Sequence, residues 1–257
     1  LGDFPEALRN LITSLKGAEE IADKNGIAYA HLNMGISYFY SKKFSEAMQN
    51  WNIALNIFKE VNDNAGITKC NANIGNYYCE TGKFAQALPY YQEIVNTCMA
   101  TGNLVGLTMG YNNLAKIYFD QGNYAQALKS CTAALKIIEQ TGDKNNAAST
   151  YTALGEIYFK QKDFSKSQDY LGKALIATQE TGNLDLKRYV YDAFVNLYSA
   201  QHDFKQALAY YKLSIATRDT MFNEENNRKT AELQLQYDTE KKEKNIALLT
   251  KESQLQQ

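Results

Sequence analysis

The residues best suited to catalysis or metal binding are few in this chain. Neither of its two histidines, His31 and His202, has a cysteine or carboxylate partner that the sequence can place. The four cysteines show no paired or metal-like spacing: Cys70, Cys79, Cys98 and Cys131. The sequence contains no phosphate-binding glycine loop followed by lysine and no HExxH motif. It therefore predicts no catalytic residue, no metal site and no cofactor, with structural roles for both histidines and buried, hydrophobic roles for the cysteines.

Three asparagines are better candidates for a function, because they recur at one spacing. Asn33, Asn73 and Asn113 are 40 residues apart, and Ala153 and Ala193 follow at the same interval. Asparagine is a poor helix former, so its repetition in a helical pattern needs a reason. One hypothesis is a ladder of side-chain amides that binds a ligand backbone. The other is amide bonding between neighbouring helices inside the protein.

The same 40-residue step runs through other columns of the sequence, without insertion. A tyrosine recurs at Tyr38, Tyr78, Tyr118, Tyr158 and Tyr198. An aromatic residue recurs at Phe4, Phe44, Phe84, Tyr124, Phe164 and Phe204, and a small residue at Ala7, Ala47, Ala87, Ala127, Ser167 and Ala207. Self-similarity at a fixed period of this size predicts a stacked repeat architecture.

Each repeat has the pattern of a helical hairpin. Tyr111, Leu114, Ala115 and Tyr118 are spaced i, i+3, i+4 and i+7, so they share one face of a helix. Glycine at 122 ends that helix in the left-handed position, and a second amphipathic helix follows up to residue 141. Small residues at 35, 75, 115 and 155 leave room for a close crossing of the two helices.

These columns resemble the tetratricopeptide repeat, in a form with 40 rather than 34 residues per unit. The resemblance covers residues 3–220 and implies an all-α fold, a right-handed superhelix or α-solenoid of helical hairpins. Residues 1–221 would form the array, with a half repeat at 3–22 and hairpins at 27–61, 64–101, 104–141, 145–181 and 184–220. In such arrays the first helix of each hairpin lines a concave surface that binds a peptide or protein.

Further side chains are expected on that surface beside Asn33, Asn73 and Asn113. These candidates mix both charge signs, and so do not indicate a pocket for the C-terminal carboxylate of a ligand. They are Tyr29, Lys69, Asn76, Asn112, Lys116, Glu156, Lys160 and Asn196.

Residues 222–257 differ in composition from the array. They contain six Lys/Arg and seven Asp/Glu in alternating runs, with no proline or glycine, which predicts one long charged helix. It would either cap the array as a solvated helix or form a rod or coiled coil that passes a signal onward and dimerises. Its heptads are imperfect, since Lys242 lies between Leu235 and Leu249 at the same phase.

The tail also resembles the linker that follows the repeats in bacterial sensor histidine kinases and related DNA-binding regulators. That resemblance implies an extracytoplasmic, periplasmic sensor part adjacent to a membrane span, with the span and output domain outside this sequence. Both ends of the sequence suit such an excised fragment. The alternative is a cytoplasmic scaffold or adaptor without signalling output. In both cases the chain itself is expected not to be an enzyme.

Composition narrows the class of partner. The chain has 27 Lys and Arg against 28 Asp and Glu, a net charge of −1. Nucleic-acid binding needs a basic face that neutralises phosphates, so this balance argues against it. The sequence has no run of 18 apolar residues that would predict a membrane span. A peptide or protein ligand remains the expectation.

Overall fold

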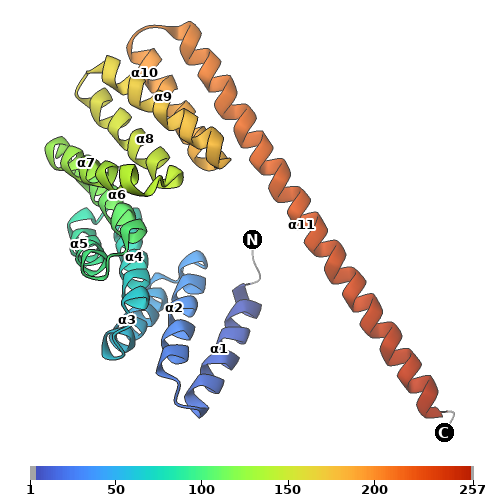
Figure 1. The fold of residues 1–257 in the computed structure, drawn as a ribbon. Coiled ribbons are helices and arrows are strands. Elements are labelled where there is room, and N and C mark those ends of the chain that lie inside the picture. The colour runs from blue at the N-terminus through green and yellow to red at the C-terminus, as the bar shows by residue number, and fades with distance from the viewer. Residues whose placement is uncertain (1–3, 256–257) are drawn as a thin grey trace. The chain divides into compact units, whose positions relative to one another are not determined.

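The computed structural model describes residues 4–255, with side chains up to Ile246 except at positions 5, 236, 240 and 245. Residue 3 of the predicted half repeat and residues 256–257 of the predicted tail lie outside this range. The described chain is all helical, as the repeat pattern predicts (Figure 1). Its helices are α1 (Phe4–Glu20), α2 (Lys24–Tyr40), α3 (Phe44–Glu60), α4 (Asn64–Glu80), α5 (Phe84–Thr101), α6 (Leu104–Asp120), α7 (Tyr124–Thr141), α8 (Lys144–Lys160), α9 (Phe164–Thr181), α10 (Leu184–Ala200) and α11 (Phe204–Leu255).

Every connection between helices is built in the same way. One residue in each connection has a positive φ, and these residues follow one another every twenty positions: Ala22, Lys42, Asn62, Gly82, Gly102, Gly122, Gly142, Lys162, Gly182 and His202. In eight of these connections the next backbone N–H bonds back over the turn, as from Lys83 to the carbonyl of Tyr78 at 2.7 Å. This left-handed cap reverses the chain within three residues. Two equal helices and two such turns account for the 40-residue period.

The starts of the helices are capped by short polar side chains. Asp63, Asn103, Asn123, Asp143 and Asn183 each accept a hydrogen bond from a backbone N–H in the first turn of the helix that follows. Such caps satisfy donors that have no partner inside the helix. The cap positions of α3 and α5 hold lysine instead and make no side-chain cap bond.

Within each hairpin a large residue fills the space left by a small one. A Cβ atom built on Gly35 would lie 2.4 Å from the ring of Trp51, and one on Gly75 would lie 2.7 Å from the ring of Tyr91. Trp51 and Tyr91 are both 1% exposed. The close crossing predicted from the small column therefore follows from steric exclusion: the glycine makes room for the partner side chain.

Three cysteines fit the expectation of small buried hydrophobes. Cys70, Cys98 and Cys131 are buried, Cys79 is half-buried, and all four thiols are free. Burial raises the pKa of Cys70 and of Cys131 to about 12, with the carboxylate of Asp63 as a further cause at Cys70. Both thiols therefore stay protonated and unreactive near neutral pH.

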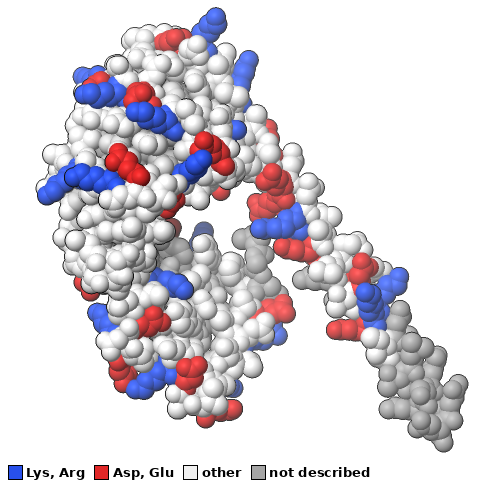
Figure 2. Space-filling view, viewed as in Figure 1, with Lys and Arg blue, Asp and Glu red and all other residues white. Residues whose placement is uncertain are grey.

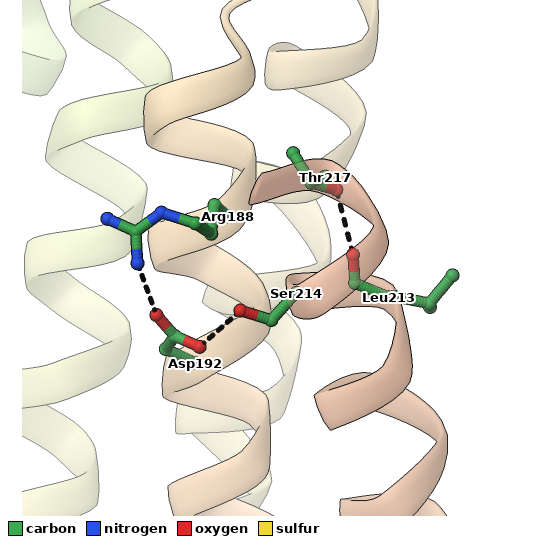
Figure 3. A network of polar contacts seen from close by, with 5 residues as sticks. All are labelled: Arg188, Asp192, Leu213, Ser214 and Thr217. Atoms are coloured by element: carbon green, nitrogen blue, oxygen red, sulfur yellow. Dashed lines mark hydrogen bonds and ion pairs between the residues drawn. The ribbon is translucent and has the colours of Figure 1, made fainter. Parts of the chain in front are cut away.

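The chain divides into two compact units, Leu1–Ala174 and Leu175–Gln257. In the second unit, α10 packs against the first half of α11. Ser214 occupies a column that holds alanine at residues 54, 134 and 174, and its hydroxyl donates to Asp192 Oδ1 at 2.6 Å (Figure 3). Arg188 Nη1 lies 3.1 Å from Asp192 Oδ2. Asp192 thus makes two polar contacts, and the one to Ser214 links α10 to α11.

The predicted boundary at residue 221 falls inside α11, which continues from the last hairpin to Leu255 as one helix. From Phe222 to Ile246 every described side chain is exposed. Lys, Arg, Asp and Glu lie intermingled along this part (Figure 2). None of the helices described combines the length and the apolar character needed to cross a membrane.

Candidate functional site

Two pairs of first helices from successive hairpins lie beside one another within the first unit. α2 contacts α4, and α6 contacts α8. Residues 40 apart occupy equivalent positions on neighbouring helices, so a column of the sequence becomes a row of side chains across them. This arrangement brings Asn33 of α2 and Asn73 of α4 to one place.

A pocket of about 450 Å³ opens between α2 and α4. Four of its lining residues are predicted site residues, namely Tyr29, Asn33, Lys69 and Asn73. The other three are apolar, namely Leu32, Ile36 and Ala72. The volume lies in the range of pockets that hold small molecules or short peptide segments, roughly 300–1,000 Å³.

Tyr29 is a fixed wall of this pocket. Its ring meets the ring of Phe58 edge-on, with centroids 4.8 Å apart, and its hydroxyl donates to Asp63 Oδ2 at 3.1 Å. Burial, and then the hydrogen bond to Asp63, raise the pKa of Tyr29, so its hydroxyl keeps its proton. The Lys69 ammonium lies 5.1 Å from the centroid of the same ring. That distance is within cation–π range.

The two amides offer the pocket its hydrogen-bonding capacity. Asn33 is exposed and Asn73 is half-buried. Within the described part of the chain neither amide bonds to another residue, so two donors and one acceptor remain on each. A peptide backbone presents the complementary C=O and N–H groups.

Two other predicted asparagines are used inside the fold. Asn76 Oδ1 accepts a hydrogen bond of 2.5 Å from Tyr91 Oη. Asn112 Oδ1 accepts from Thr150 Oγ1 at 2.7 Å, which links α6 to α8. Bonding between neighbouring helices, the second hypothesis for the asparagine column, thus describes Asn112 rather than Asn33 and Asn73.

The remaining predicted residues do not line this pocket. Asn113 is half-buried on α6, one hairpin further along the chain, and Lys116 is exposed on the same helix. Burial raises the pKa of Asp120, and the charge of nearby Lys116 opposes that rise. Glu156 belongs to α8 and interacts with at least one other residue. Asn196 is an exposed residue of α10 in the second unit.

Sequence reasoning missed the apolar side of the pocket. Ile36 occupies the column of Asn76 and Lys116, and Leu32 and Ala72 share the column of Asn112. The same 40-residue register that selects the polar candidates would have identified all three.

Both histidines make contacts within the fold. His31 Nδ1 lies 2.9 Å from Asn50 Oδ1, which ties α2 to α3. His202 is the left-handed residue of the turn before α11, with its ring against Phe204. Among the described residues no group of three or more His, Cys, Asp or Glu could hold a metal ion. The pocket therefore offers binding groups: amides, an ammonium, a phenol and an apolar wall.

Solved structures share this architecture. BtubC from P. vanneervenii superposes with a TM-score of 0.72 at 19% identity, over 86% of this chain and 93% of that one. A STAND signal-transduction ATPase with a tetratricopeptide repeat sensor, PH0952 from Pyrococcus horikoshii, gives 0.68 at 20% identity, over 80% of this chain and 32% of the other. A Rap protein complexed with competence and sporulation factor gives 0.59 at 14% identity, over 85% and 71%. At these identities the likeness concerns the fold.

Among curated proteins none matches the sequence significantly. A sequence profile of the tetratricopeptide repeat, however, matches residues 27–100, 107–180 and 147–220, which is most of the chain. The helical hairpins, their 40-residue register and the small residues at each crossing agree with that match. The chain belongs to the tetratricopeptide repeat family.

Proposed function

We propose that this chain is a non-catalytic binding module that holds an extended peptide, or an extended segment of a partner protein, against the first helices of its hairpins. The observation that carries the proposal is the pair Asn33 and Asn73. Their amides flank one open pocket from neighbouring helices, at equivalent positions, and have no hydrogen-bond partner among the described residues. Amides repeated along a groove can bond to the repeated amides of an extended ligand.

The structural relatives support a ligand of this kind. One Rap protein of the same fold was solved in complex with competence and sporulation factor. A complex of that kind in a protein of the same fold supports a ligand-binding role for this chain.

The binding module belongs, in our proposal, to a bacterial signal-transduction protein. The relative PH0952 is described as a tetratricopeptide repeat sensor, which supports a sensing role. α11 supports a route for the signal, because it joins the last hairpin and the charged tail in one helix. The tail would pair with a second copy and lead to a membrane span, which would place the module outside the cytoplasm. A cytoplasmic scaffold without output is the competing function.

Binding is tested with a phage-displayed library of random dodecapeptides. We expect the wild-type chain to enrich peptides, and the Asn33→Ala, Asn73→Ala double variant to lose them while its helicity is unchanged. Asn56→Ala is the matched control, since Asn56 is an exposed asparagine on the second helix of the same hairpin. Equal enrichment by the double variant would show that the ligand binds elsewhere.

The parent gene separates the sensor from the scaffold. A signal peptide upstream and a membrane span soon after Gln257 would support the sensor, whereas a reading frame that stops near Gln257 would support the scaffold. Light scattering of chains with and without residues 222–257 tests pairing of the tail. A monomer in both cases would rule out a dimer through α11.

A further inference from the structure

Among the described residues, the Lys69 ammonium of the α2/α4 pocket has no counterion. Lys69 is exposed, and within the described residues its ammonium makes a cation–π contact with Tyr29 and no ion pair. The pocket lining contains no acidic residue. An ammonium in that position adds a positive potential to the site.

Asp63, the carboxylate that bonds to the pocket residue Tyr29, is already used by the fold. Asp63 Oδ1 accepts hydrogen bonds from the backbone N–H groups of Ala65 and Gly66, both at 3.0 Å, and Oδ2 accepts from the Tyr29 hydroxyl. Asp63 thus caps α4 and orients the tyrosine ring. Its negative charge is turned to the start of a helix, where the helix dipole favours it.

Charge and shape together define the occupant. The lining combines the Lys69 ammonium and the amides of Asn33 and Asn73 with the apolar side chains of Leu32, Ile36 and Ala72. We propose that this pocket selects an extended peptide in which an acidic side chain, Asp or Glu, pairs with Lys69 and a neighbouring aliphatic side chain rests on Leu32, Ile36 and Ala72. This inference rests on the proposed peptide-binding function and adds its specificity.

The make-up of the pocket favours a carboxylate over a phosphate. Proteins that recognise phosphate groups gather arginine forks or several cations, because the phosphate carries a charge near −2. This pocket is lined by one ammonium, of Lys69, and by two neutral amides, which matches a single negative charge. A carboxylate can come from a side chain or from a peptide C-terminus, so the experiment must distinguish these sources.

The test uses the whole chain and N-acetylated, C-amidated hexapeptide pools, each with one amino acid held constant at one position. We expect pools with a constant Asp or Glu to bind about three- to fivefold more tightly than the matching Asn or Gln pools, the range of a partly exposed ion pair. Lys69→Gln should abolish this preference and keep binding, and Lys69→Glu should favour Lys or Arg pools. Lys129→Gln, which removes an exposed lysine from α7, is the matched control and should change nothing.

The other outcomes distinguish a failure of peptide binding from a failure of the role assigned to Lys69. If no pool binds the wild-type chain, the proposed function itself fails. If pools bind without an acidic preference, or if Lys69→Gln keeps that preference, peptide binding stands and the role of Lys69 is refuted. A preference that requires a free C-terminus, or one met only by phosphoserine pools, would overturn the side-chain carboxylate.

Discussion

At the scale of single residues, the contact between Gly35 and Trp51 shows how one missing atom sets the geometry of a hairpin. The Trp51 ring occupies the position that a Cβ atom at residue 35 would need. The equivalent pair in the third hairpin is Ala115 with Cys131, where a smaller partner leaves space for a methyl group. A larger side chain at one position of a pair is therefore accompanied by a smaller one at the other, so the two positions must be interpreted together.

This pairing predicts the effect of adding one methyl group. Gly35→Ala should lower the free energy of unfolding by about 1–3 kcal/mol, because the buried indole must move and the core is overpacked. Gly172→Ala is the control, since its Cβ would meet nothing within 4 Å in α9. That control should gain about 1 kcal/mol from helix propensity. Urea unfolding measures both, and a loss at Gly172 equal to that at Gly35 would refute the steric account.

Buried thiols predict a loss of stability at alkaline pH. An unfolded cysteine releases its proton near pH 8.5, whereas the pKa of Cys131 in the fold is about 12. Between these values the unfolded state binds fewer protons, so stability falls as pH rises. Cys131 alone should contribute a slope of about 1.4 kcal/mol per pH unit in that window.

Urea unfolding at pH 7, 10 and 11 measures the slope. Cys131→Ala should show a shallower decline than the wild-type chain. Ala134→Gly, a buried substitution in the same helix without a titrating group, should keep the wild-type slope. An unchanged slope in Cys131→Ala would mean that this thiol does not couple folding to pH.

At the scale of helices, the turns and caps explain the regular period. Glycine at five of the positive-φ positions adopts this conformation without a Cβ penalty, while Lys42, Lys162 and His202 are held in it by the bonds across the turn. The caps follow the same register at residues 63, 103, 123, 143 and 183. Helices α2, α3 and α5 depart from it, because their cap residues make no side-chain cap bond.

The missing caps predict a stabilising substitution. Lys43→Asp should raise the free energy of unfolding by about 1 kcal/mol, because the carboxylate can accept from the unpaired N–H groups at the start of α3. Lys43→Ser should give much of this gain without the negative charge. Asn123→Ala, which removes an existing cap from α7, should lose a similar amount. Thermal unfolding of the three variants measures these changes, and no gain from either replacement of Lys43 would contradict the prediction.

At the scale of the whole molecule, a repeat array makes its contacts between neighbouring hairpins, so its stability is approximately a sum of local terms. The chain has a single tryptophan, Trp51, which reports on the first unit. The hydrogen bond between Ser214 and Asp192 belongs to the second unit (Figure 3). The two units can therefore be perturbed and observed separately.

Asp192→Ala should destabilise the second unit more than the first. It leaves the buried Ser214 hydroxyl without its acceptor, at a cost of about 1–3 kcal/mol. The urea transition followed by helical circular dichroism should then begin before the one followed by Trp51 fluorescence. Gly35→Ala should reverse that order. Coincident transitions in both variants would show that the chain unfolds as one cooperative unit.

The repeat, its all-α class and its family follow from the sequence alone, because a fixed 40-residue register of Tyr38, Phe44 and Ala47 and their counterparts leaves few other ways to bury these faces. The register also brings Asn33 beside Asn73. The register could not distinguish these two residues from Asn76 and Asn112, whose amide oxygens accept hydrogen bonds from Tyr91 and Thr150. Nor could it show that Ser214 bonds to Asp192 or that Asp63 caps α4 and accepts from Tyr29. A period states which residues are equivalent, whereas the partner of each polar atom depends on distances between helices that only the tertiary structure defines.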